Sequence, residues 1–212
     1  MKRFRLSGVI FFAVLYIVAG CTLMGGTRAP TKSYVLNSLH TEETPPQPVA
    51  DLPDIGILVG PVRLALYLDR AAIVIRDSQN KIEITEFSQW AGPLQENFSR
   101  VLAENLALLL STDRVGIFPG TRAILFDYNV TVYITRFDGK PGEKAHLRAR
   151  WIILDKNRKK TLFEKHTRLS QPTENDSMEA LIAAESRTLA DLSREIAEAV
   201  KVLAKAKTKG KN

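Results

Sequence analysis

The single cysteine, Cys21, is the residue whose chemistry the sequence indicates first. It stands directly after the small residues Ala19 and Gly20. One thiol has no partner for a disulfide within the chain. Residues 1–20 combine a basic head, an apolar stretch from Val9 to Val18 and a small-residue end, which is the order found in secretory signals. The apolar stretch is shorter than the roughly 20 residues that cross a bilayer. The sequence therefore predicts a signal peptide that is cut before Cys21.

The residues Ile17-Val18-Ala19-Gly20-Cys21 resemble a lipobox, the processing site of bacterial lipoproteins. This resemblance implies that the sulfur of Cys21 carries a diacylglycerol and that the new amino group is acylated. Val18 stands where the usual pattern has Leu. An Asp after the lipidated Cys retains enteric lipoproteins at the inner membrane, and Thr22 is not that residue, so the resemblance implies a lipid anchor at the periplasmic face of the outer membrane. The alternative is an uncleaved anchor with a buried, inert cysteine.

Other side chains give little indication of catalysis. The histidines are scattered, at His40, His146 and His166. None of them belongs to a close pair suited to a metal, and no Gly-x-Ser-x-Gly motif is present. The adjacent carboxylates Glu42 and Glu43 lie in a proline-rich segment where nothing would fix their geometry. We therefore predict a protein that is not an enzyme, with no metal site and no cofactor beyond the covalent lipid on Cys21.

The positive charge of the chain lies mostly at its two ends. The formal net charge is +7 and the isoelectric point is about 9.6. Residues 1–20 carry three basic residues and no acid, and residues 201–212 carry five lysines and no acid. The part between them is nearly neutral, which is not typical of a nucleic-acid-binding protein. The basic tail, 201–212, is predicted to be disordered, and it either contacts anionic headgroups or is simply solvated.

The composition divides the mature chain into three parts. Residues 21–53 are predicted to be a flexible lipidated tether that can hold a short strand at Tyr34–Leu36 and that ends in a proline-rich linker. Residues 54–200 are long enough for one domain with a proper core. The basic tail follows this domain.

The apolar patterns within residues 54–200 predict an α+β fold. Alternation predicts strands at 55–60, 72–76, 81–85, 115–118, 126–135, 147–153 and 161–169. The last three form an antiparallel meander, with Trp151 in the core. Helical spacing predicts one helix from Ser88 or Pro93 to Ser111, and a second from a capping box at Asp176 and Glu179 to about residue 200. We expect an antiparallel or mixed β-sheet with both amphipathic helices packed on one face, as a single domain.

Several short segments, taken in order, resemble the PqiC/YmbA family of auxiliary lipoproteins of ABC-type transport systems. The matching segments are Tyr34-Val35-Leu36; Ile57 with Val59, Pro61 and Val62; Tyr67-Leu68-Asp69-Arg70 with Ile73, Val74 and Arg76; Trp90-Ala91-Gly92-Pro93-Leu94; Arg100-Val101-Leu102-Ala103-Glu104-Asn105-Leu106; Arg136-Phe137-Asp138; Leu147-Arg148-Ala149-Arg150-Trp151; and Leu192-Ser193 with Glu195-Ile196-Ala197. Gly92 departs from the pattern, which often has an acid there. The resemblance covers nearly the whole mature chain.

The resemblance implies an outer-membrane-anchored subunit of an MCE/ABC-type, Pqi-like system that moves lipid between membranes and supports envelope integrity. Such a subunit would dock the periplasmic tunnel of MCE-domain proteins, as a ring-shaped homo-oligomer without nucleic acid. The alternative is a stand-alone structural lipoprotein of the envelope or an outer-membrane assembly factor.

The candidate interface residues are Tyr67, Leu68, Asp69, Arg70 and Trp90. The segment around residues 62–70 is apolar without a clean period, which is typical of a loop that a partner buries. In the alternative interpretation, Tyr67 and Leu68 pack on the domain's own sheet and Asp69 and Arg70 form a surface ion pair. Trp90 is either an interface anchor or a cover for the sheet.

Overall fold

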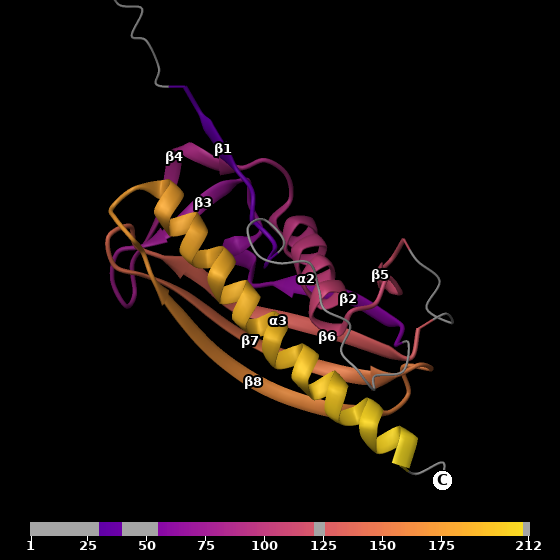
Figure 1. Ribbon diagram of the computed structural model, residues 1–212. Helices are drawn as coiled ribbons and strands as arrows, with labels where there is room; N and C mark the ends of the chain where they lie inside the picture. The colour runs from indigo at the N-terminus through magenta and orange to yellow at the C-terminus, as the bar shows by residue number, and fades with distance from the viewer. Residues whose placement is uncertain (1–29, 40–54, 121–125, 210–212) are drawn as a thin grey trace, which may run out of the picture. The chain divides into compact units, whose positions relative to one another are not determined.

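A computed structural model describes residues 30–39, 55–120 and 126–209 (Figure 1). Apart from Pro30, these residues belong to one compact unit, Thr31–Asn212. Three predicted features lie outside the described residues: the signal peptide, the lipidation site at Cys21 with Thr22, and the proline-rich linker at 40–53.

The described elements are runs of strands interrupted by a few helices within a single α+β domain, which confirms the predicted fold class. They are β1 (Lys32–Tyr34), β2 (Ile57–Leu64), the 3₁₀ turn η2 (Leu66–Leu68), β3 (Ala72–Arg76), β4 (Ile82–Trp90), α2 (Leu94–Leu110), β5 (Val115–Ile117), β6 (Tyr128–Gly139), β7 (Lys144–Asp155), β8 (Thr161–Pro172) and α3 (Met178–Lys209). The strands of this part of the chain form one mixed sheet.

Strand β6 lies at the centre of the sheet. Along one side it pairs with β7 in antiparallel fashion, and β7 pairs with β8, which confirms the predicted meander. Along its other side β6 pairs in parallel with β2, where Ile57 faces Tyr128, and near its end with β3, where Ile75 faces Gly139. The parallel pairs β2–β5 and β1–β4 extend the sheet. Strand β6 therefore joins the antiparallel meander of β7 and β8 to the other strands of the sheet.

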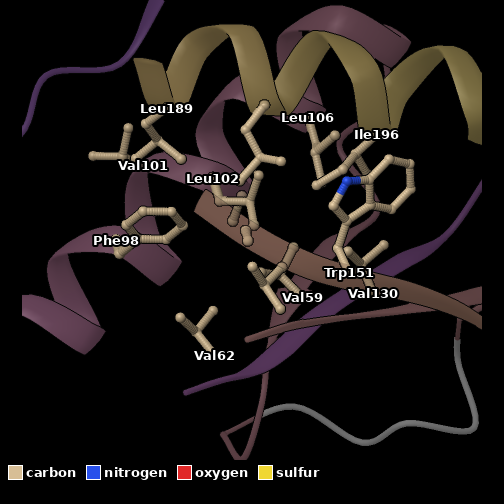
Figure 2. Close-up of a cluster of buried hydrophobic side chains, with 14 of the residues drawn as sticks. Val59, Val62, Phe98, Val101, Leu102, Leu106, Val130, Trp151, Leu189 and Ile196 are labelled. Carbon is tan, nitrogen blue, oxygen red and sulfur yellow. The ribbon is translucent and has the colours of Figure 1, made fainter. Parts of the chain in front are cut away.

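Helices α2 and α3 pack against each other and cover one face of the sheet (Figure 1). Figure 2 shows Phe98, Leu102 and Leu106 of α2 and Ile196 of α3 gathered over Trp151 and its neighbours from the sheet. Trp151 is fully buried, as its place in the strand pattern predicts, and its indole N–H donates to the hydroxyl of Thr167 at 2.9 Å. Burial of these apolar side chains is the main stabilising contribution to the fold.

Asn105, the one polar residue in the apolar stripe of α2, is fully buried and fully partnered. Its amide nitrogen donates to the hydroxyl of Ser193 on α3 at 3.1 Å. Its amide oxygen accepts the backbone N–H of Leu39 at 2.8 Å. Because both polar atoms are satisfied, this side chain ties the two helices to the segment that follows β1 without a desolvation penalty.

The structure decides or corrects the predicted helix ends at three places. Of the two predicted starts of the first helix, Pro93 is confirmed and Ser88 is not, because β4 continues to Trp90 and α2 begins at Leu94. The hydroxyl of Ser177, and not the carboxylate of Asp176, caps α3 by accepting the backbone N–H of Ala180 at 3.1 Å. In both cases neighbouring residues could each begin or cap the helix, and the sequence pattern does not distinguish between them.

The third difference is the C-terminus, where the prediction of a disordered tail from residue 201 is wrong for residues 201–209. Helix α3 continues to Lys209. Alanine and lysine are strong helix formers. Ala204 is buried against the core, and Lys207 lies 3.3 Å from a carboxylate oxygen of Asp127. The intrinsic helix preference and these contacts together extend the helix.

Candidate docking site at residues 65–71

The segment between β2 and β3 is a tight turn, held by backbone hydrogen bonds. The N–H of Ala65 donates to the carbonyl of Ile134 on β6 at 2.9 Å, and the N–H of Leu68 donates to the carbonyl of Ala65 at 2.9 Å. At the end of the turn, the carbonyl of Ala71 accepts the N–H of Trp90 at 2.8 Å. We call residues 65–71 the docking segment, because its side chains separate into buried anchors and exposed tips.

Tyr67 anchors the docking segment to a buried ion cluster. Its hydroxyl donates to Oδ2 of Asp138 at 2.9 Å, and Asp138 is fully buried. The guanidinium of Arg76 donates to both carboxylate oxygens of Asp138 at 2.8 to 3.1 Å. Arg136 donates from Nε to Oδ1 at 2.7 Å. The guanidinium of Arg76 also lies 5.8 Å from the centre of the Tyr67 ring, a cation–π distance. Four side chains from three elements therefore hold this turn.

The protonation states of the cluster follow from burial and hydrogen bonding. Burial alone would raise the pKa of Asp138, but the hydrogen bonds from Arg76, Arg136 and Tyr67 outweigh it, so its pKa lies below the ordinary value. Burial and then the negative charge of Asp138 raise the pKa of Tyr67 to about 12. At neutral pH Asp138 is therefore an ionised acceptor and Tyr67 a neutral donor. Removing one partner would leave buried charge uncompensated.

The predicted interface residues divide between the core and the surface. Leu68 and Trp90 are buried, at 2% and 4% exposure, and the Trp90 ring stacks 6.5 Å from that of Phe137. Asp69 and Arg70 are exposed, and no ion pair joins them in the described part of the chain. They border a hollow of about 380 Å³ whose other wall includes Trp90. Within the domain, then, only Asp69 and Arg70 of these four side chains face solvent.

Leu66 is the most exposed large apolar side chain among the described residues, at 88%. It lies at the tip of the docking segment, next to the pinned Tyr67. The sequence prediction did not include it among the site residues, because an apolar residue in an apolar stretch gives no indication of exposure. A single exposed leucine is common on protein surfaces, so Leu66 is a candidate contact only together with its exposed neighbours Asp69 and Arg70.

Glu185 is a second feature that the sequence prediction missed. It occupies a position in the apolar stripe of α3, between Ile182 and Leu189, and is 1% exposed. Its Oε2 has no hydrogen-bond partner among the described residues. Burial, and then the negative charge of Asp138, raise its pKa well above the ordinary value. The protonated form of Glu185 is therefore favoured more than it is for a glutamate in water. The signal available in the sequence was a carboxylate at helical spacing within a hydrophobic face.

Comparison with known protein families identifies the family of this chain. The sequence profile of the ABC-type transport auxiliary lipoprotein components matches residues 34–197. The chain belongs to this family. The predicted resemblance to PqiC/YmbA-type lipoproteins is thereby confirmed, and the protein is an auxiliary lipoprotein of an ABC-type transporter. No curated protein matches the chain by sequence.

Two solved structures share the fold of this family member. Protein XCC0632 from Xanthomonas campestris has a TM-score of 0.69 at 15% identity, over 84% of this chain and 99% of that one. An uncharacterized protein has a TM-score of 0.65 at 17% identity, over 81% of this chain and 99% of that one. At these identities the likeness concerns the fold alone.

The described part of this auxiliary lipoprotein contains no cluster of three or more His, Cys, Asp or Glu side chains that could hold a metal ion. Neither described helix is long and apolar enough to cross a bilayer. His146 and His166 both lie on strands, on β7 and β8. His40 lies outside the described residues.

Proposed function

We propose that this auxiliary lipoprotein is anchored by lipid on Cys21 to the periplasmic face of the outer membrane. There it would dock the periplasmic tunnel of an MCE-type lipid transport system, as a ring of identical copies, in a binding role without catalysis and without a cofactor other than the lipid. Membership of a family of ABC-type transport auxiliary lipoproteins supports a role beside a transporter. The lipobox and Thr22 support the anchor and its membrane.

The observation that carries the docking role is the docking segment itself. It presents Leu66, Asp69 and Arg70 to solvent on a backbone that Tyr67 and the buried Asp138 hold in place. A surface that is already ordered loses little conformational entropy when a partner binds. An exposed leucine flanked by a charge of each sign offers both an apolar anchor and polar contacts that fix orientation.

The test is affinity purification of the tagged, lipidated protein from crosslinked cells. We expect co-purification of an MCE-domain protein. Leu66→Gln and Asp69→Arg should each reduce its recovery, with a thermal transition within a few degrees of the wild type, because both side chains are exposed. Val202→Gln is the matched control, since Val202 is also exposed, at 66%, but lies on α3.

Recovery of only peptidoglycan or barrel-assembly proteins would support the stand-alone structural role and contradict the proposal. A second arm tests the anchor. Labelled fatty acid should enter the wild type and not Cys21→Ala, and this variant should leave the outer-membrane fraction. Unchanged location of Cys21→Ala would refute the lipid anchor independently of the docking role.

A further inference from the structure

The face of the sheet that is turned away from α2 and α3 carries two rows of cationic side chains. In one row, the register places Arg63 of β2, Tyr133 of β6, Arg150 of β7 and His166 of β8 side by side. In the other, Arg136, Arg148 and Arg168 lie side by side across β6, β7 and β8. We call Arg63, Arg136, Arg148, Arg150 and Arg168 the arginine face.

Alternation along the strands places this set opposite the helices. Ala149 and Trp151, which flank Arg150 on β7, are buried with the helix-covered core. Arg148 and Arg150 therefore point to the other side of the sheet, since successive side chains of a strand alternate. Arg63, Arg148 and Arg168 are exposed.

The arginine face is only partly neutralised. Arg136 pairs with Asp138 at 2.7 Å, and Arg150 pairs with Glu164 at 2.7 Å. No carboxylate partner of Arg63, Arg148 or Arg168 is found among residues 30–39, 55–120 and 126–209. The face is therefore left with cations that are free to meet an anionic partner.

The stability of the isolated domain does not account for the pairing of arginines on this face. Arg148 lies directly opposite Arg168 and also opposite Arg136, and like charges opposite each other on a sheet destabilise it. The ring of Tyr133 has a guanidinium on either side, from Arg63 at 5.8 Å and from Arg150 at 5.7 Å. This stack orders the two arginines while leaving their N–H groups for another acceptor. Anions on the face would relieve the repulsion between the neighbouring arginines.

A hollow of about 570 Å³ continues the arginine face toward the turn between β6 and β7. Arg136, Arg148, Lys144 and His146 line it, together with the carboxylates Asp77 and Glu143, which both pair with Lys140. The pKa of His146 is lowered, first by burial and then by the positive charges of Arg136, Arg148 and Lys144. The negative charge of Asp138 opposes this shift without reversing it. A histidine that resists protonation here is consistent with a positive potential over this end of the face.

We propose that the arginine face binds the phosphate headgroups of an anionic phospholipid bilayer. Guanidinium groups match phosphate oxygens bidentately. The face spreads its cations over four neighbouring strands, a width of about 14 Å at the usual strand spacing, which suits a surface with many phosphates better than a single ligand. The choice of a bilayer as the partner rests on the proposed lipid anchor at Cys21. A fully extended chain of residues 21–31 spans at most about 36 Å, so an anchored domain stays close to its membrane.

The test uses residues 31–212 without lipid, since this range contains the whole described core, and it is therefore independent of Cys21. Its binding is measured by co-sedimentation with vesicles of phosphatidylcholine alone and of phosphatidylcholine with phosphatidylglycerol at low salt. We expect binding only to the anionic vesicles, weakening as salt is added. One basic residue near an anionic surface contributes about fivefold in affinity, so Arg148→Gln with Arg168→Gln should bind about 25-fold more weakly.

The matched control is Lys201→Gln with Lys205→Gln, which removes the same charge from α3 on the other side of the sheet. Compared at about 0.1 M salt, it should weaken binding less than about threefold, because charges more than about 10 Å from the bound surface are then largely screened. The arginine pair variant should keep its thermal transition, since it relieves a repulsion; if it fails to fold, Arg168→Gln alone replaces it, with about a fivefold loss expected.

Equal binding to neutral vesicles, equal losses in the two pairs of variants, or no binding of the wild type would overturn the proposal. Binding to soluble polyglutamate but not to vesicles would assign the face to an acidic protein and would also overturn it. Because the domain carries no lipid, each of these results leaves the anchor and the docking role to their own tests.

Discussion

Replacing Asp138 with Ala tests whether the buried ion cluster holds the docking segment. Asp138 is fully buried and accepts hydrogen bonds from Arg76, Arg136 and Tyr67. The two arginine side chains are only 19% exposed, so removal of the carboxylate leaves two poorly hydrated cations facing each other. Breaking a buried pair in this way costs about 3–5 kcal/mol. For a domain of this size, that lowers the thermal transition by about 6–20 °C.

The assay is thermal and urea unfolding followed by circular dichroism, with Asp77→Ala as the control. Asp77 also pairs with two cations, Lys81 and Lys140, but on the surface. Its loss should cost under about 1 kcal/mol. If Asp138→Ala is no more destabilising than Asp77→Ala, the buried cluster does not hold the segment and the reasoning is refuted.

The pH dependence of this difference follows from the lowered pKa of Asp138. The unfolded chain, with an ordinary aspartate pKa of 3.8, binds the proton more readily than the folded protein does. The stabilisation by Asp138 is therefore fully present above pH 3.8 and is lost as the pH falls through the lower folded-state pKa. The part of the gap that comes from the titration of Asp138 itself should be constant from about pH 5 to pH 8 and should shrink only in acid; any slope between pH 5 and pH 8 reports Glu185 and His146, whose pKa values Asp138 also affects.

Two further predictions concern stability. Glu185→Gln should be at least as stable as the wild type at pH 7 and should lose less stability between pH 5 and pH 8 in urea titrations. The reason is that the folded wild type holds a proton on Glu185 more tightly than the unfolded chain does, so its free energy of unfolding falls as the pH rises. A strongly destabilised variant would mean that the carboxylate is ionised and paired. Gly139→Ala should cost about 1–3 kcal/mol in the same assay, because its Cβ would come within 2.5 Å of the carbonyl oxygen of Lys144 and 2.7 Å of Cδ1 of Leu181; an unchanged transition midpoint would show that these neighbours yield freely.

The sequence predicts those parts of the fold that local periodicity determines. The apolar stripes of α2 and α3 and the alternation along β6, β7 and β8 predict these elements and the packing of both helices on one face. The parallel pairs were not predictable, because the partner of a parallel strand is set by tertiary packing and not by a turn. The segment 86–90 does not alternate, so its sequence does not distinguish the end of a strand from the start of a helix.

The candidate site was predictable only in its position along the chain. The sequence singled out residues 67–70, but which of these side chains are buried depends on contacts with residues more than 60 positions away. Tyr67 meets Asp138 across 71 positions, and Arg76 meets it across 62. No spacing within one element reports such a contact. The exposure of Leu66 and the burial of Trp90 follow from the same long-range arrangement.

The separation of Tyr67 from Asp138 along the chain also has a consequence for biogenesis. A polypeptide that ends before β6 contains every residue of the docking segment but neither Asp138 nor Arg136, which secure it. Fragments from interrupted synthesis or proteolysis therefore cannot form the ordered contact surface. Only a copy that has completed its central strand can form the ion cluster, so an ordered segment 65–71 reports an intact β6.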